Sequence, residues 1–168
     1  MRKWRDSTSG SNGVVVMKVI VYEMKYADTD LSESNIECIP FSEVYFQEYM
    51  KIYNDCFYEM RKSLDIQPYD CISEFGQIEN KTDDIFLLIE NGEIVGSVAC
   101  YKNEIDDLIV DPKFQHRGYG RQLLLWGMNK IRQNNNDPIT LHVAQWNENA
   151  VALYEKVGFT VIKTERVR

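Results

Sequence analysis

The sequence lacks any apolar run of about 20 residues, the length that a helix needs to cross a bilayer. Its first apolar segment, Val14–Tyr22, is interrupted by Lys18 and has no small-residue cleavage site behind it. We therefore predict neither a membrane partner nor a secretory signal. We expect residues 1–13 to be a disordered or vector-derived tail. Residues 14–168 are expected to form one domain, because 168 residues that are 44% hydrophobic can bury a substantial core.

Closely spaced cysteine pairs are also missing. The four cysteines lie far apart and include no Cys-x-x-Cys pair: Cys38, Cys56, Cys71 and Cys100. Zinc sites built from cysteine use short spacings, so the sequence excludes a site of that kind, and we expect no bound metal. Isolated cysteines are typical of free thiols in a reducing compartment, which predicts a cytoplasmic protein.

The chain has fewer basic residues than acidic ones. The chain has 19 Lys and Arg against 26 Asp and Glu, for a net charge of −7. Proteins that bind nucleic acid directly use clustered basic side chains to contact phosphates, so we expect no direct nucleic-acid partner. An acidic surface instead tolerates cationic partners such as amines.

The hydrophobic pattern predicts several strands and three helices. The first helix is expected to have Ser42 as its N-cap and apolar residues at three-to-four spacing over 44–60. The second covers 120–131, with Gly120 and Gly127 on its apolar face, where they would let the helix approach the sheet closely. The third covers 147–156 and is expected to stop at Gly158. Strands are predicted at 14–26, 36–41, 85–89, 94–101, 105–110, 139–143 and 159–163, with a hairpin turn at Asn91-Gly92.

The stretch Gln115–Gly120 joins a predicted strand to the second helix. Gly118 and Gly120 lack Cβ atoms, so backbone N–H groups at the helix start can approach a phosphate, and Arg117 and Arg121 can add charge-assisted bonds. The same residues also fit a tight turn with two solvated arginines. No Gly-Lys-Ser/Thr follows, which excludes a Walker loop, and the preceding hairpin fits poorly with a dinucleotide-binding fold.

A second pair of residues lies downstream. Asn147 stands at a helix start, and Tyr154 follows two turns later on the same face. Alone, the pair fits a capping asparagine and a core tyrosine.

Together, these segments resemble the acetyl-CoA-binding motifs of the GCN5-related N-acetyltransferase (GNAT) family. The resemblance covers about half of the chain and rests on Leu108-Ile109-Val110-Asp111-Pro112, on Gln115-x-x-Gly118-x-Gly120, and on the run from Asn147 through Tyr154 to Phe159. It implies an α/β (α+β) fold. In this fold a mixed, mostly antiparallel central sheet is flanked by helices, and splayed strands form the acyl-CoA cleft.

The resemblance also implies roles for particular residues. The strand should offer backbone groups to the pantetheine arm, the loop should hold the pyrophosphate, and Asn147 should bind the cofactor arm. The residues expected to bind acetyl-CoA are Leu108, Ile109, Val110, Gln115, His116, Arg117, Gly118, Tyr119, Gly120, Arg121 and Asn147.

Tyr154 matches the residue that commonly protonates the departing CoA thiolate. A phenol with a pKa of about 10 is protonated at neutral pH and can give its proton to a thiolate. Glu104 matches the glutamate base of the histone-acetylating branch, while Asp106 and Asp107 are alternatives that would act through water. All three also fit solvated acids at a strand end. His142 is expected to have a core or edge role.

The sequence thus predicts an N-acetyltransferase that moves an acetyl group from acetyl-CoA, its cosubstrate, to a primary amine by direct attack in a ternary complex. The acceptor is expected to be a small amine-bearing molecule, and the protein a monomer or homodimer. A non-catalytic acyl-CoA-binding module is the alternative, and a transferase with a longer acyl chain or a hydroxyl acceptor is a third reading. The tyrosines of residues 42–82 fit either an aromatic acceptor wall or helix packing.

Overall fold

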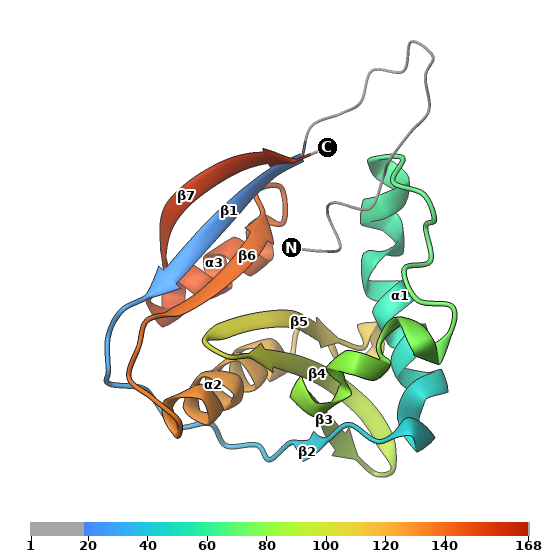
Figure 1. Cartoon of the computed structure of the whole chain (residues 1–168), viewed down its shortest axis with the longest axis horizontal. Helices are drawn as coiled ribbons and strands as arrows, with labels where there is room; N and C mark the ends of the chain where they lie inside the picture. The colour runs from blue at the N-terminus through green and yellow to red at the C-terminus, as the bar shows by residue number, and fades with distance from the viewer. Residues whose placement is uncertain (1–18, 168) are drawn as a thin grey trace.

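The computed structural model describes residues 19–167, which form a seven-stranded mixed sheet (Figure 1). The tail expected at residues 1–13 lies outside the described residues. The strand order is β2-β3-β4-β5-β6-β1-β7, and every neighbouring pair is antiparallel except β5 and β6. The strands are β1 (Val19–Tyr26), β2 (Ile39–Pro40), β3 (Ile85–Glu90), β4 (Glu93–Tyr101), β5 (Glu104–Val110), β6 (Ile139–Ala144) and β7 (Thr160–Val167).

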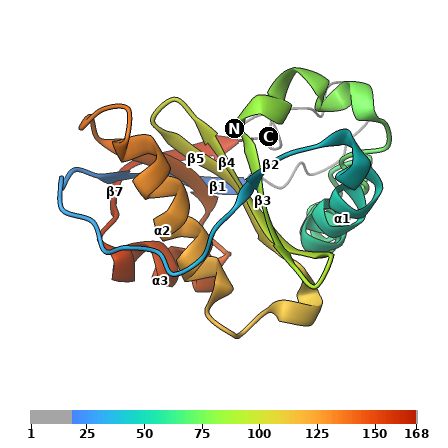
Figure 2. The same cartoon turned by 90° about the horizontal axis from the view of Figure 1, so that it is seen from below.

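Helices cover both faces of the sheet. α2 (Tyr119–Arg132) and α3 (Glu148–Val157) lie on one face, and α1 (Phe46–Ser63) lies on the other (Figure 2). Between α1 and β3 the chain forms two short 3-10 helices, η3 (Phe75–Gln77) and η4 (Glu79–Asp84). This arrangement confirms the predicted mixed, mostly antiparallel sheet flanked by helices.

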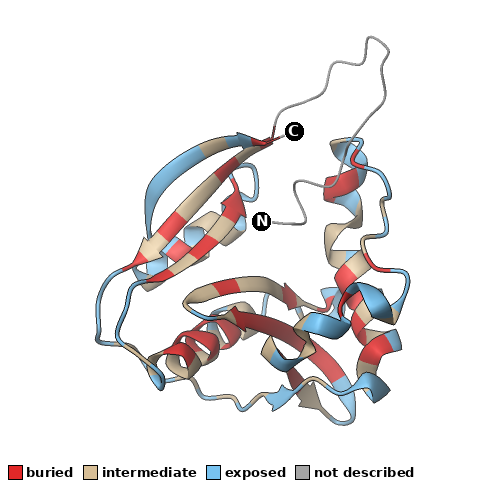
Figure 3. Ribbon diagram, in the orientation of Figure 1, coloured by how far each residue is buried: buried red, intermediate tan, exposed pale blue. Residues whose placement is uncertain are grey.

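The main core lies between α2 and the middle of the sheet. Leu123, Leu124 and Met128 of α2 are fully buried against β4 and β5, and Figure 3 shows the buried positions gathered there, while β7 is exposed along most of its length. Gly127 permits this packing, because a Cβ there would come within 2.9 Å of Ile105 Cδ1. The close approach expected at Gly120 is absent, since a Cβ there would lie at an ordinary 3.6 Å from Leu153 Cδ2.

The start of α1 differs from the prediction. The 3-10 turn η2 (Glu43–Tyr45) stands between Ser42 and the helix, and the Ser42 side chain makes no capping hydrogen bond. Val44, predicted to lie on the apolar face, is 81% exposed. Tyr45 packs against the core and Phe46 is the first buried residue of the segment, and the α-helix begins at Phe46 rather than at the polar signal before it.

Two local predictions are confirmed. Asn91 and Gly92 both have positive φ, 51° and 77°, as a two-residue hairpin turn between β3 and β4 requires. Gly158 ends α3 with φ 119°, and Asn147 caps its start by accepting a hydrogen bond from the Ala150 N–H at 3.4 Å.

Candidate active site

The sheet opens between β5 and β6. The two strands pair only at Glu104–Thr140 and Ile105–Leu141, and beyond these pairs they diverge, as Figure 1 shows. A bulge in the β4–β5 pairing lies at the same level, between Ser97 and Ala99, and opposite it Asp107 has a φ of 45°, which is uncommon for a residue other than glycine. The bulge bends β5 away from β6, which produces the predicted splay.

The splayed part of β5 turns backbone groups toward the opening. The Asp111 N–H donates to the Val95 carbonyl at 2.9 Å, and Val110 stands opposite Gly96 one position earlier. Because backbone groups alternate along a strand, those of Val110 and Leu108 face away from β4. The Val110 carbonyl accepts hydrogen bonds from Gln115 Nε2 at 3.1 Å and from the Cys56 thiol, with 3.3 Å between Sγ and O.

The glycine-containing loop adopts the conformation expected of an anion-binding turn. His116 and Gly118 both have positive φ, 63° and 86°, and α2 begins at Tyr119 immediately after them. Such alternation turns successive N–H groups to one side, and the first N–H groups of a helix have no acceptor inside it. The loop can therefore receive a phosphate through its backbone.

A groove of about 310 Å³ runs from this loop to α3. Nine of the predicted site residues line it, together with Phe114, Asn149, Ala150 and Leu153. The nine are Leu108, Val110, Gln115, His116, Gly118, Tyr119, Gly120, Asn147 and Tyr154. A groove bordered by an open strand edge and a helix N-terminus fits an extended ligand with a phosphate group.

Other predicted residues lie elsewhere. Ile109 is 3% exposed and its side chain packs in the α1-side core. Arg121 is exposed, and the Arg117 guanidinium lies 5.7 Å from the centre of the Phe114 ring. Tyr119 does line the groove, but its hydroxyl donates to Glu90 Oε2 at 2.8 Å, so the tip of its side chain is directed to the end of β3.

Tyr154 stands where the groove meets a second cavity. It is 8% exposed, and its ring packs 6.0 Å from that of Phe159. The second cavity, about 100 Å³, is lined by Tyr154 and Asn147 on one side and by Asp106, Asp107 and Leu108 of β5 on the other. The tyrosine thus borders both the phosphate-side groove and the bent segment of β5.

The three acidic candidates for a base occupy two different places. Glu104 is the first residue of β5, where the sheet is still closed, and its Oε1 lies 2.9 Å from Nδ1 of His142. His142 is not at a sheet edge, because β6 lies between β5 and β1. Asp106 and Asp107 line the second cavity instead, and the sequence offers no signal for the positive φ of Asp107.

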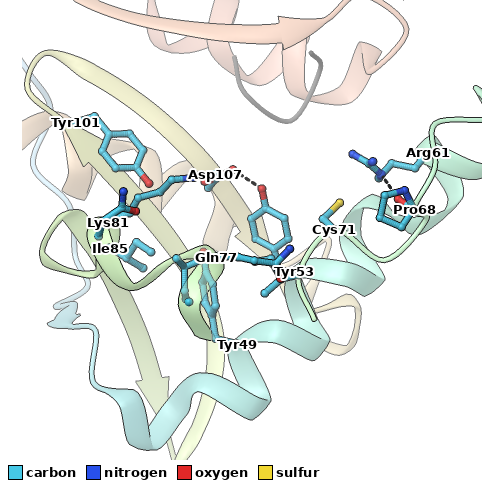
Figure 4. A pocket seen from close by; sticks show the side chains of 14 residues that line it. Tyr49, Tyr53, Arg61, Pro68, Cys71, Gln77, Lys81, Ile85, Tyr101 and Asp107 are labelled. Carbon is cyan, nitrogen blue, oxygen red and sulfur yellow. Dashed lines mark hydrogen bonds between the residues drawn. The ribbon is translucent and has the colours of Figure 1, made fainter. Parts of the chain in front are cut away.

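A third cavity, of about 470 Å³, lies on the α1 side of β5 and also reaches Asp107 (Figure 4). The Tyr53 hydroxyl donates a hydrogen bond to Asp107 Oδ1 at 2.8 Å. Tyr49 and Tyr101 line the same space. Burial, followed by the charge of Asp107, raises the pKa of both Tyr49 and Tyr53 well above the usual range, so both remain phenols and can donate hydrogen bonds.

A covalent route through Cys100 has little support. Cys100 is 8% exposed beside Gly127, and burial raises the pKa of its thiol to about 12, so it is a poor nucleophile. The described part of the chain contains no group of three or more His, Cys, Asp and Glu residues placed to hold a metal ion.

None of the helices described has the length and apolarity that crossing a membrane requires.

Several curated proteins resemble parts of this chain. A mycothiol acetyltransferase from Propionibacterium freudenreichii is 39% identical over 64 residues, which are 38% of this chain and 20% of that protein. The mycothiol acetyltransferase of Corynebacterium glutamicum strain ATCC 13032 is 33% identical over 92 residues, 52% of this chain and 32% of that protein. An uncharacterized N-acetyltransferase from Methanocaldococcus jannaschii is 30% identical over 97 residues. This chain spans less than half of each relative's length.

Solved structures share the fold at low sequence identity. A protein from Pyrococcus horikoshii OT3 matches 79% of this chain and 95% of its own, with a TM-score of 0.64 and 24% identity. An acetyltransferase from the GNAT family of Colwellia psychrerythraea matches 89% of this chain and 55% of its own, with a TM-score of 0.65 and 13% identity. The sequence pattern of the acetyltransferase (GNAT) family matches residues 46–159, which hold most of the sheet, all three helices and the groove. The chain therefore belongs to the acetyltransferase (GNAT) family.

Proposed function

We propose that the protein is an N-acetyltransferase that moves the acetyl group of acetyl-CoA to a primary amine in a ternary complex. The observation that carries this proposal is the position of Tyr154, which borders both the groove under the glycine loop and the cavity beside Asp107. A donor in the groove and an acceptor at Asp107 would meet beside its hydroxyl.

The described residues fit acetyl-CoA. The loop at His116–Gly118 and the start of α2 supply N–H groups for the pyrophosphate, and the open edge at Leu108 and Val110 supplies partners for the amide groups of the pantetheine arm. The Leu108 N–H can also polarise the thioester carbonyl. The Val110 carbonyl already accepts from Cys56 and Gln115, so the arm would share or displace these contacts.

The reaction assigns one role to each side of the cleft. The ammonium group first gives one proton to a carboxylate, which passes it to solvent. The neutral nitrogen then forms a bond to the acetyl carbon and loses its second proton to the carboxylate, and the bond between that carbon and the CoA sulfur breaks. Tyr154 gives its proton to the departing thiolate, and proton exchange of the carboxylate and of Tyr154 with solvent restores the starting state.

Three carboxylates are candidates for the base. Glu104 is the residue that the family resemblance implies, and it is hydrogen-bonded to His142 at the closed end of β5. Asp106 lines only the second cavity, whereas Asp107 lines both the second cavity, which Tyr154 borders, and the third cavity. The geometry favours Asp107.

Acetyl-CoA-dependent release of free thiol, followed across a panel of amines, tests the proposal. We expect release that depends on the acceptor and gives an acetylated amine by mass spectrometry. Tight CoA binding with no acceptor-dependent release across the panel would favour a non-catalytic binding module instead. Release with alcohols alone, or only with longer acyl-CoA donors, would favour a different transferase.

The cytoplasm is the compartment that we propose, and the four free cysteines support it. We propose a monomer or homodimer that acts without nucleic acid, membrane or metal.

A further inference from the structure

Lys81 presents a positive charge to the third cavity, which we call the aromatic cavity, and among the described residues it has no carboxylate partner there. It lies on η4, is half-buried, and lines the cavity together with Tyr49, Tyr53 and Tyr101. Within residues 19–167, no carboxylate lies within 4.0 Å of its ammonium group. A half-buried lysine that faces a cavity without an ion pair is placed to bind an anionic group from outside.

A second cation lines the same cavity. Arg61 of α1 is 5% exposed, and its Nε donates to the Pro68 carbonyl at 2.7 Å. In the view of Figure 4, Arg61 lies on one side of Asp107, and Lys81 and Tyr101 lie on the other. Asp107 is the carboxylate of the lining and stands between the two cations.

The charge balance of this cavity is opposite to that of the whole protein. The lining holds two cationic side chains and one carboxylate, whereas the chain carries a net charge of −7. A simple amine would add a third positive charge beside Asp107. A molecule that brings a carboxylate with its ammonium group would instead meet an opposite charge at each end.

Resting on the proposed function, we infer that the acceptor is a small zwitterion that carries both a primary amine and a carboxylate, as an amino acid does. Its ammonium group would sit at Asp107, next to the second cavity and Tyr154, where acetyl transfer would occur. Its carboxylate would bind Lys81, with the Arg61 charge nearby. The rings of Tyr49 and Tyr53 would contact its apolar body, for which about 470 Å³ is ample.

Matched pairs of acceptors test this inference directly. Phenylalanine and phenethylamine, tyrosine and tyramine, and leucine and isoamylamine differ only by the carboxylate. We expect kcat/KM for each amino acid to exceed that of its amine at least about 10-fold, the effect of one charge-assisted contact. Equal values, or a preference for the amines, would overturn the inference.

Variants of Lys81 locate the contact. Lys81→Met should lower kcat/KM for the amino acids about 10-fold without lowering it for the amines, so that the preference disappears. Lys81→Arg, which keeps the positive charge, should retain the preference for the amino acids. Lys62→Met is the matched control, because Lys62 is exposed on α1 and lies over the Tyr58 ring, outside the cavity lining. A preference that survives Lys81→Met would remove Lys81 from the site.

Binding to the CoA-loaded protein separates this inference from the proposed function. Calorimetry should show that the amino acids bind and that Lys81→Met raises their dissociation constants about 10-fold. Binding of this kind without thiol release would support the zwitterion site and contradict acetyl transfer. Thiol release with simple amines, with no binding of amino acids, would support the proposed acetyl transfer and contradict the inference that the acceptor is a zwitterion.

Discussion

Tyr53 donates its hydroxyl hydrogen to Asp107 over 2.8 Å and so joins α1 to the bent segment of β5. Asp107 has a φ of 45° and lines both the second and the third cavity. The hydrogen bond fixes the direction of the carboxylate at the place where the acceptor amine is proposed to lie.

The phenol of Tyr154 is predicted to matter for turnover rather than for donor binding. Tyr154→Phe keeps the ring that packs on Phe159 but removes the proton donor. We expect kcat to fall about 100-fold, a typical loss for a general acid, while the dissociation constant of CoA changes less than about threefold. Steady-state kinetics and calorimetry on the same preparation measure both. An unchanged kcat would remove Tyr154 as the acid.

The glycine loop gives a prediction with an internal control. Gly118 and Gly92 both have positive φ, 86° and 77°, and a Cβ at either would meet no protein atom within 4 Å. Alanine at either position should therefore cost a similar free energy of unfolding, about 1 kcal/mol. Only Gly118→Ala should weaken CoA binding, because only that loop borders the groove. Equal CoA affinities in the two variants would indicate that the loop is a turn that does not bind CoA.

The identity of the base is tested by two isosteric changes. We expect Asp107→Asn to lower kcat about 100-fold, because it removes the carboxylate between the cavities. Glu104→Gln should have a smaller effect and should keep the shape of the wild-type pH–rate profile. If Glu104→Gln instead suppresses the rate most strongly at low pH, Glu104 is the base and its contact with His142 positions it.

One buried and two half-buried thiols predict how stability depends on pH. Burial raises the pKa of Cys38, Cys56 and Cys100 from a reference of 9.0 to about 12. The folded state therefore holds these protons more tightly than the unfolded state. Their stabilising contribution is complete below about pH 9 and is lost as the pH rises toward 12. Urea unfolding under reducing conditions should show a lower free energy at pH 10 than at pH 8, and a higher value would contradict the assignment.

The same shifts predict slow alkylation. At pH 8 a thiol with a pKa of about 12 has roughly 1000-fold less thiolate than one with a pKa of 9. Iodoacetamide should label Cys56 correspondingly slowly, as followed by peptide mass spectrometry. Rapid labelling of Cys56 in the folded protein would show that burial does not protect this thiol.

Local sequence signals predicted the structure correctly where one residue type determines the backbone conformation. The Asn91-Gly92 turn was predicted and has the positive φ that such a turn requires, and α3 starts after Asn147 and ends at Gly158 as expected. Ser42 failed as a side-chain cap because burial of Phe46, not a polar side chain, sets the start of α1.

The site was predicted less completely, because some of it depends on contacts between distant segments. The spacing of Asn147 and Tyr154 placed them on one helix, and the structure brings both to the groove. No pattern distinguished Asp107 from Glu104, since the difference arises from a bulge in the β4–β5 pairing. The cavity around Lys81 could not be predicted from the sequence either, because residues of α1, the 3-10 helices and β5, which are distant in the sequence, line it together.

The groove and the aromatic cavity are built from separate stretches of the chain. The groove takes its lining from residues 108–154, whereas the aromatic cavity takes all but two of its lining residues from 49–85. Substitutions in the earlier stretch could therefore change which molecule is modified while the later stretch keeps its donor. Exchanging residues 49–85 between related proteins would then be expected to transfer acceptor preference as a unit, provided that Tyr101 and Asp107 stay in place.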